Sequence, residues 1–463
     1  MLTEICLGAL LLSLFGGDPL FEDRLIATVP EGIALEGEPV RYPDGTLVPT
    51  RSPIQWSPDG LQVAYMGYKD SAWHAVVGEH VSAPFDYLGI PAFGNRGDDV
   101  VFRAGKRKSK KKESWTLYRG PNEKKGKSLD WVGAPAIAPD GSRVLAWNQP
   151  GATLAADGSY QRKGMVMFGG WKKKAQRWED ALALTAPVFS SDGSVAFTAG
   201  LKNDQWSVIE VSKRGEREVL QGLFGVIDIA VAPETNDLAV TGTVYTTQVD
   251  VRGNKIEPES KLPDGAFGSF SGFSKGVRLH YGKKVIGEDY DAAWDAGFSG
   301  NGKKIAYKVM KDGKMGVASE DEPGARVEWD FVTRPVLSES GDRVAFVANT
   351  GATLSMALMT TRWADSRERG GKDQLLWFKT KSQGEVEPLG EPAERISHVT
   401  FGPGDDQIGY AVRTKDGWRV HCGASKSDVY DEVGPLCFNE EGTIVGFGAR
   451  SKRELLWRTL TLE

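Results

Sequence analysis

The sequence has 463 residues, of which 40% are hydrophobic and 26% are charged, and this is the composition of an ordinary globular protein. Its formal net charge of −5 lacks the basic excess typical of nucleic-acid-binding proteins, so we expect no specific nucleic-acid partner. The 56 glycines and 14 tryptophans favour short strands joined by tight turns over helices.

An apolar run from Ile5 to Phe15 lies near the start of the chain. It is too short to span a bilayer, so we expect no transmembrane segment, and it has the length of a signal-peptide core. No Lys or Arg precedes it, and the following residues do not form a good cleavage site, so an apolar cap on the domain is the alternative. We treat residues 1–20 as a separate segment and expect a periplasmic or extracellular protein, with a cytoplasmic one as the alternative.

From residue 56 onwards, one short pattern recurs nine times: an apolar anchor, a tight polar turn that usually ends in glycine, and an alternating strand. A repeat of about 40 residues is typical of the four-stranded blades of a β-propeller, and no helical periodicity is present. The anchors are Trp56, Phe93, Ile137, Phe189, Val231, Phe298, Leu337, Phe401 and Phe438.

The strand that follows each turn alternates, so that Val63 and Tyr65 lie on one face and Ala64 on the other. We predict an all-β fold over residues 21–463, a single β-propeller of eight or nine four-stranded antiparallel blades. The last repeat ends after its third strand, and the region 24–50 has no repeat of its own. We therefore expect the N- and C-terminal segments to pair and close the domain, which removes exposed sheet edges.

The clearest copy of the repeat is "SPIQWSPDGLQVAY" at residues 52–65. It resembles the bacterial Pro-Asp-Gly repeat of TolB-type, WD40-like β-propellers, and the resemblance extends from about Pro53 to Glu463. The same repeat occurs in propellers attached to prolyl-oligopeptidase-like enzymes. The resemblance implies the propeller fold but not a function, because this scaffold has many unrelated roles.

Insertions lengthen three of the loops between second and third strands, at about 149–164, 243–275 and 349–372, and the basic stretch "KRKSKKK" occupies another such loop. Loops of this class lie on one face of a propeller, so we expect a binding face there. Tolerated loop growth and a simply solvated basic hairpin are the alternatives. The candidate contact residues are Lys106, Arg107, Lys108, Lys110, Lys111, Lys112, Tyr245, Phe270, Met356, Arg362 and Trp363.

These features favour a non-enzymatic, monomeric scaffold that binds a protein partner or an extended ligand. The alternative is a hydrolase or lyase that acts on a glycan or lactone in the central channel, which needs carboxylates or histidines on the first strands of several blades. Only Gln55, Arg334 and His398 lie near such positions, and other repeats have alanine or valine there. We therefore expect a chemically poor channel.

Three further patterns carry no chemistry in this interpretation. Ser274 in "GFSKG" matches the nucleophile elbow, but the α/β sheet that this motif needs is absent from the sequence. The five histidines are dispersed, and no metal-ligand spacing is present, so we expect no metal and no cofactor. Cys422 and Cys437 are expected on non-adjacent strands, so we expect no disulfide between them.

Overall fold

The structure is a computed structural model, and the chain divides into two compact units, Met1–Thr198 with His398–Glu463, and Ala199–Ser397. It describes residues 19–36, 53–94, 99–109, 112–120, 124–125, 132–141, 143–148, 153–154, 160–161, 165–169, 176–178, 183–202, 205–212, 214–244, 248–249, 255–256, 277–281, 284–290, 292–321, 326–352, 370–380 and 385–462. Within these residues no helix is both long and apolar enough to cross a membrane.

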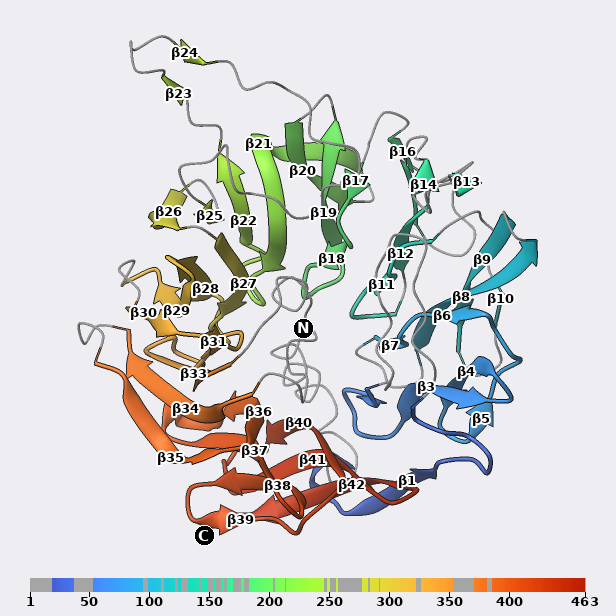
Figure 1. Cartoon of the computed structure of the whole chain (residues 1–463), viewed down its shortest axis with the longest axis vertical. Coiled ribbons are helices and arrows are strands. Elements are labelled where there is room, and N and C mark those ends of the chain that lie inside the picture. Colours follow the sequence, from blue (N-terminus) through green and yellow to red (C-terminus); the bar gives the residue numbers. More distant parts are fainter. Residues whose placement is uncertain are drawn as a thin grey trace. The chain divides into compact units, whose positions relative to one another are not determined.

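The first unit contains antiparallel sheets in which neighbouring strands follow one another along the chain (Figure 1). The first sheet consists of β2 (Gln55–Trp56), β3 (Val63–Lys69), β4 (Ala72–Val77) and β5 (His80–Val81). The second consists of β6 (Tyr87–Leu88), β7 (Ala92–Phe93), β8 (Val100–Ser109), β9 (Lys112–Arg119) and β10 (Lys124–Lys125). The third consists of β11 (Ala136–Ile137), β12 (Val144–Asn148), β15 (Met165–Gly169) and β16 (Gln176–Trp178).

The C-terminal part of the chain forms two more sheets of the same kind. One consists of β36 (Arg395–Phe401), β37 (Ile408–Thr414), β38 (Gly417–Cys422) and β39 (Ser425–Lys426). The other consists of β40 (Glu432–Phe438), β41 (Ile444–Ser451), β42 (Glu454–Thr461) and β1 (Arg24–Thr28), which follows the short 3-10 turn η2 (Pro19–Phe21). A second 3-10 turn, η3 (Pro403–Asp405), follows β36.

The second unit contains two sheets with this strand order. One consists of β27 (Ala292–Phe298), β28 (Ile305–Lys311), β29 (Lys314–Ser319) and β30 (Arg326–Trp329). The other consists of β31 (Phe331–Val332), β32 (Val336–Leu337), β33 (Arg343–Thr350), β34 (Lys372–Lys379) and β35 (Glu387–Ala393).

An eight-stranded sheet covers the repeats anchored at Phe189 and Val231. It consists of β17 (Ala183–Leu184), β18 (Val188–Phe189), β19 (Val195–Lys202), β20 (Gln205–Ser212), β21 (Gly215–Val231), β22 (Leu238–Val244), β25 (Val277–Tyr281) and β26 (Lys284–Tyr290). Its central strand β21 is 17 residues long and pairs with β20 on one side and β22 on the other. These two repeats therefore form one continuous sheet and not two separate blades.

The fold is an all-β β-propeller with four-stranded antiparallel blades, as predicted, but the expected number of eight or nine blades is wrong. The structure has seven blades. The physical reason is the uninterrupted strand β21, which continues from the end of the Phe189 repeat into the Val231 anchor and so leaves no turn at which one sheet could end and the next begin.

The predicted pairing of the two terminal segments is present in the first unit. β1 is antiparallel to β42, with Arg24 opposite Trp457 and Thr28 opposite Glu454. Asp23 extends this junction, because its Oδ1 accepts a hydrogen bond from the Thr459 N–H at 2.7 Å. The N-terminal strand thus supplies the fourth strand that the last repeat lacks.

The recurring turn explains why each repeat starts a new hairpin. In the first copy, Ser57 Oγ donates to Asp59 Oδ1 at 2.6 Å, and the same carboxylate accepts from the Leu61 N–H at 3.1 Å. Gly60 has a φ of +63°, and a Cβ there would lie 2.8 Å from the Trp457 indole, so the position requires glycine. The turn aspartate is therefore a structural cap, and the turn glycine also permits close packing between blades.

The alternating strands are buried on both faces, as expected for thin sheets that pack between neighbours. In β3 the first five residues are all buried, and Val63, Ala64, Tyr65 and Met66 are fully enclosed. The insertions at about 149–164 and 349–372 lie between the second and third strands along the order of their sheets, and the one at about 243–275 lies between β22 and β25 of the eight-stranded sheet. Two of the insertions contain short hairpins. These are β13 (Thr153–Leu154) with β14 (Tyr160–Gln161), and β23 (Gln248–Val249) with β24 (Lys255–Ile256).

Cys422 and Cys437 are both buried free thiols.

Candidate functional site

The structure describes three of the predicted contact side chains, Lys106, Arg107 and Lys108, which are exposed at the end of β8. Lys112 begins β9, but its side chain is not among those described. The remaining candidates lie outside the described residues, as does Ser274: Lys110, Lys111, Tyr245, Phe270, Met356, Arg362 and Trp363.

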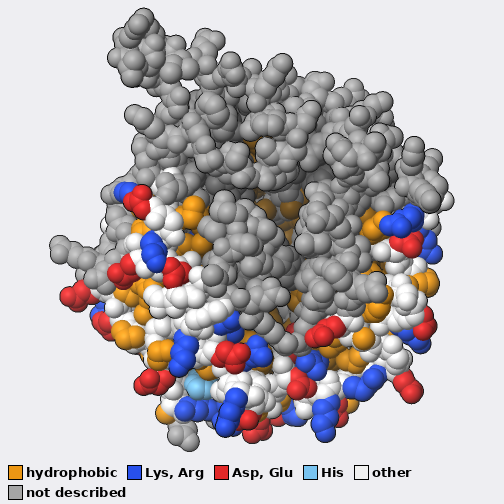
Figure 2. Space-filling model, in the orientation of Figure 1, with side chains coloured by type: hydrophobic (Ala, Val, Ile, Leu, Met, Phe, Trp, Pro, Cys, Tyr) orange, Lys and Arg blue, Asp and Glu red, His pale blue; other side chains and the backbone are white. Residues whose placement is uncertain are grey.

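Strands β8 and β9 form a long hairpin that carries the basic stretch 106–112, which we call the cationic hairpin. The register places Arg107 opposite Glu113 and Ser109 opposite Lys112, with an irregularity between these pairs. On the face shown in Figure 2, basic and acidic side chains are intermixed over the described surface. The cationic hairpin has six cations within seven residues, which is a local concentration of positive charge in a chain whose net charge is negative.

The base of the cationic hairpin is held against the preceding link by aromatic rings. The Lys106 ammonium lies 5.8 Å from the centroid of the Phe85 ring, and the Arg107 guanidinium lies 5.5 Å from that of Tyr87. Arg107 also donates to the Tyr87 hydroxyl, and its main-chain N–H donates to Asp86 Oδ2 at 2.8 Å. Such cation–π contacts contribute about 0.5–1 kcal/mol each at exposed sites. The two residues are therefore held in place at the surface.

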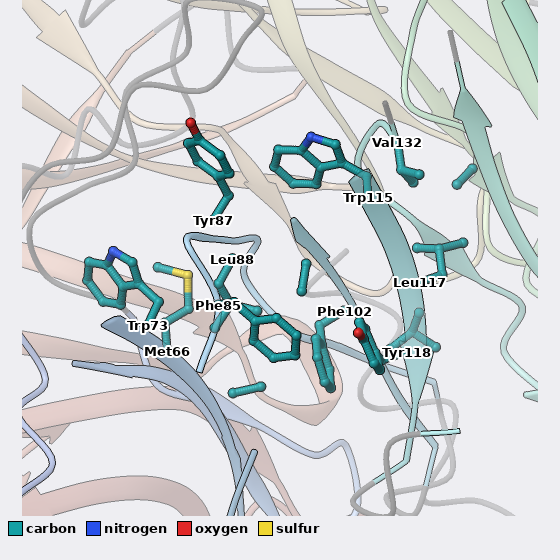
Figure 3. Close-up of a cluster of buried hydrophobic side chains, with 14 of the residues drawn as sticks. Met66, Trp73, Phe85, Tyr87, Leu88, Phe102, Trp115, Leu117, Tyr118 and Val132 are labelled. Atoms are coloured by element: carbon teal, nitrogen blue, oxygen red, sulfur yellow. The ribbon is translucent and has the colours of Figure 1, made fainter. Parts of the chain in front are cut away.

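The rings beneath these cations belong to a buried core (Figure 3). Tyr87 and Trp115 are stacked with their centroids 5.5 Å apart, and Trp115 is fully buried. The Arg103 guanidinium lies 5.8 Å from the Trp115 centroid, and its Nη1 donates to the carbonyl oxygen of Val132 at 2.8 Å. The core therefore makes the base of the hairpin rigid.

A second group of charged residues lies in the second unit; of these, Arg334 was named from the sequence, whereas Asp228 and Asp295 were missed. Asp228, Asp295 and Arg334 each lie three residues before the anchor of their repeat. Strands β21 and β27 contact each other, as do β27 and β32, so the first strands of these repeats are neighbours. His398 has the equivalent position in its own sheet. When the repeats are aligned three residues before their anchors, four successive repeats have a charged or titratable residue. The expectation of a chemically poor channel compared residues at two different positions of the repeats, so this series was not apparent.

Asp295 has an unusual backbone conformation, with a φ of +53° at a register shift of β27 between Trp294 and Gly297. Its Oδ2 lies 3.1 Å from Lys308 Nζ, and the side chains are 21% and 6% exposed respectively. Bulges next to functional sites commonly redirect a side chain, and positive φ in a non-glycine residue stores strain. The strand is therefore distorted where it presents this carboxylate.

Aromatic rings surround the Lys308 ammonium, which lies 5.0 Å from the Trp294 centroid and 5.4 Å from that of Phe331. Within the same bulge, the carbonyl oxygen of Ala296 accepts a hydrogen bond from Arg334. We call Trp294, Asp295, Lys308, Phe331 and Arg334 the β27 cluster. In the part of the chain that the structure describes, no group of three His, Cys, Asp or Glu side chains could hold a metal ion.

No protein-family model matches the chain, and no curated protein matches it in sequence. The structure is similar to solved structures that contain propellers. One is the β-propeller domain of the Trilobed protease from Pyrococcus furiosus, with 11% identity, coverage of 82% of this chain and 96% of that one, and a TM-score of 0.35. Another is a prolyl endopeptidase, with 13% identity and a TM-score of 0.39, where the match covers 91% of this chain but only 59% of that one.

A third similar structure is an oligogalacturonate lyase in complex with manganese, with 9% identity, coverage of 93% of this chain and 99% of that one, and a TM-score of 0.34. The fold class of the present chain follows from its own strand order.

Proposed function

We propose that the protein is a binding scaffold that recognises an acidic, extended segment of a partner protein through the cationic hairpin. The observation that carries this proposal is the placement of Lys106 and Arg107 over the rings of Phe85 and Tyr87. A basic stretch that was only solvated would have no such support at its base. Here the hairpin presents its charges from a rigid platform, which lowers the entropic cost of binding.

Electrostatics determines which ligand fits this surface. Clustered cations attract a chain of carboxylates, raise the association rate and lose this advantage as salt increases. The resemblance to the Pro-Asp-Gly repeat of TolB-type propellers agrees with the propeller fold and does not distinguish a scaffold from an enzyme. Membership of that repeat family, a monomeric state and a periplasmic or extracellular localisation all remain predictions.

The test is direct binding of a fluorescent poly-L-glutamate peptide to the full chain at low and high salt. The variant K106E/R107E/K108E should weaken binding at least tenfold. The matched control is R214E/K303E/K415E, which makes the same change in net charge at exposed cations of other turns and hairpins. This control should weaken binding less than threefold.

Three results would contradict the proposal. Equal loss in both triple variants would mean that net charge alone governs the interaction. Absence of binding by the unmodified protein at low salt, or tighter binding of lipopolysaccharide than of poly-glutamate, would exclude an acidic protein segment as the ligand.

A second candidate function is a hydrolase or lyase that acts on a glycan or lactone. It is supported by the carboxylates of Asp228 and Asp295 at the same position of neighbouring first strands, since paired carboxylates serve general acid–base chemistry. A screen of glycan and lactone substrates would test it. Activity that survives both Asp228→Asn and Asp295→Asn would exclude these residues as its source.

A further inference from the structure

We infer that the β27 cluster is a binding site for a small organic carboxylate, in which Arg334 pairs with the carboxylate group of the ligand. This inference is independent of the cationic hairpin, which lies in the other unit. It depends on the balance of charges in the cluster and on the donors of Arg334.

The charges of the cluster do not cancel. Lys308 and Asp295 form an ion pair, with Nζ and Oδ2 3.1 Å apart, and together they are neutral. Arg334 is half-buried and donates to the carbonyl oxygen of Ala296, and no carboxylate among the described residues forms an ion pair with it. A guanidinium has five N–H donors, so most of those of Arg334 are available to a ligand. The cluster therefore has one excess positive charge.

The position of Arg334 is fixed by close packing between the two sheets of the second unit. A Cβ on Gly297 would lie 2.7 Å from the carbonyl oxygen of Pro335, which follows Arg334 directly. The Val347 N–H donates to Thr333 Oγ1 at 3.0 Å, and the Thr333 N–H donates to the Val347 carbonyl at 2.9 Å. The backbone on both sides of Arg334 is thus anchored, and the hydrogen bond to the Ala296 carbonyl orients its guanidinium.

The chemistry of the cluster selects a carboxylate with an apolar body. The planar fork of arginine matches a carboxylate through two parallel hydrogen bonds. The half-buried indole of Trp294 provides aromatic surface in the same cluster. Asp295, whose backbone is strained, forms the ion pair with Lys308 and neutralises its charge. The excess positive charge of the cluster is therefore that of Arg334.

The experiment uses 4-fluorobenzoate as the probe and follows its 19F NMR line width during titration with the full chain. We expect Arg334→Gln to weaken binding at least tenfold and Arg334→Lys to retain part of it. Asp295→Asn should strengthen binding, because Lys308 then lacks its counter-charge and adds to the positive potential. The control Arg419→Gln, at a half-buried arginine of β38, should leave binding unchanged.

Acetate and inorganic phosphate are the competing ligands. Displacement of the probe by phosphate at lower concentrations than by acetate would overturn the assignment to carboxylates. Equal binding by the unmodified protein and Arg334→Gln would overturn the site itself, as would weaker binding by Asp295→Asn when circular dichroism shows both variants to be folded.

Discussion

Arg119, at the end of β9, donates a hydrogen bond from Nη2 to the carbonyl oxygen of Gly141 in the turn of the following sheet, at 2.5 Å. Its Nε also donates to Asp99 Oδ1 at 2.8 Å. Arg143 repeats this arrangement one repeat further on, where it donates to the carbonyl oxygen of Gly193. In this part of the first unit, the carbonyl groups of the turn glycines are therefore attachment points between successive repeats.

Arg119→Gln should destabilise the protein by about 1–3 kcal/mol, because it leaves the Gly141 carbonyl and the Asp99 carboxylate without their charged donor. The matched control is Arg217→Gln, which breaks the Arg217–Glu210 ion pair on β20 and β21. The Arg217 side chain is 71% exposed, against 28% for Arg119, so this loss should stay within about 0.5 kcal/mol. Denaturant unfolding measures both, and equal losses would show that the Gly141 contact is not stabilising.

Tyr65→Phe should leave the free energy of unfolding unchanged or raise it by up to about 1 kcal/mol. The Tyr65 hydroxyl is fully buried without a hydrogen-bond partner, and burial raises its pKa well above the usual range. Removing an unsatisfied hydroxyl removes a desolvation cost while the ring continues to fill the core. Thermal unfolding is a sufficient measurement. A loss of more than 1 kcal/mol would mean that the hydroxyl has a partner, such as a bound water.

Local features of the fold could be predicted because each depends on residues close in the sequence. The Asp-Gly turns, the alternation around Tyr65 and the missing strand of the last repeat are all of this kind. The number of blades could not be predicted in this way. Whether two alternating runs form one strand or two depends on how β21 pairs on both of its edges. That pairing involves partners distant in the sequence.

The candidate sites show the same limit. The concentration of lysines at residues 106–112 is visible in the sequence, but the aromatic support under Lys106 and Arg107 comes from a neighbouring link. In the β27 cluster, Asp295 could be found from the repeat alignment. The positive φ of Asp295 and its pairing with Lys308 could not be found in this way, because no glycine or proline at Asp295 indicates the β-bulge.

Asp373→Ala should destabilise the second unit by about 2–4 kcal/mol. The Asp373 carboxylate is fully buried, and it accepts hydrogen bonds from the Ile396 N–H at 2.9 Å and from Asn349 Nδ2 at 2.7 Å. Loss of this acceptor leaves buried donors unsatisfied. The control is Asp237→Ala at an exposed position of the same unit, with an expected change within about 0.5 kcal/mol. Urea unfolding compares the two, and similar effects would contradict a structural role for Asp373.

The pH dependence of stability should contain a contribution from His421. Burial lowers the pKa of this histidine below its ordinary value, and the positive charges of Lys426 and Arg419 lower it further. The unfolded chain therefore binds a proton at a higher pH than the native protein does. The stabilisation by neutral His421 is complete above the unfolded pKa and is lost as pH falls towards the folded pKa.

His421→Gln should consequently lose less stability than the unmodified protein between pH 7.5 and pH 5.5, measured by denaturant unfolding at both values. Lys426→Gln is the second variant, because it removes one of the charges that lower the pKa and should give an intermediate loss. Parallel losses in all three proteins would show that His421 titrates alike in the folded and unfolded chain, so that neither its burial on β38 nor its cationic neighbours affect its proton affinity.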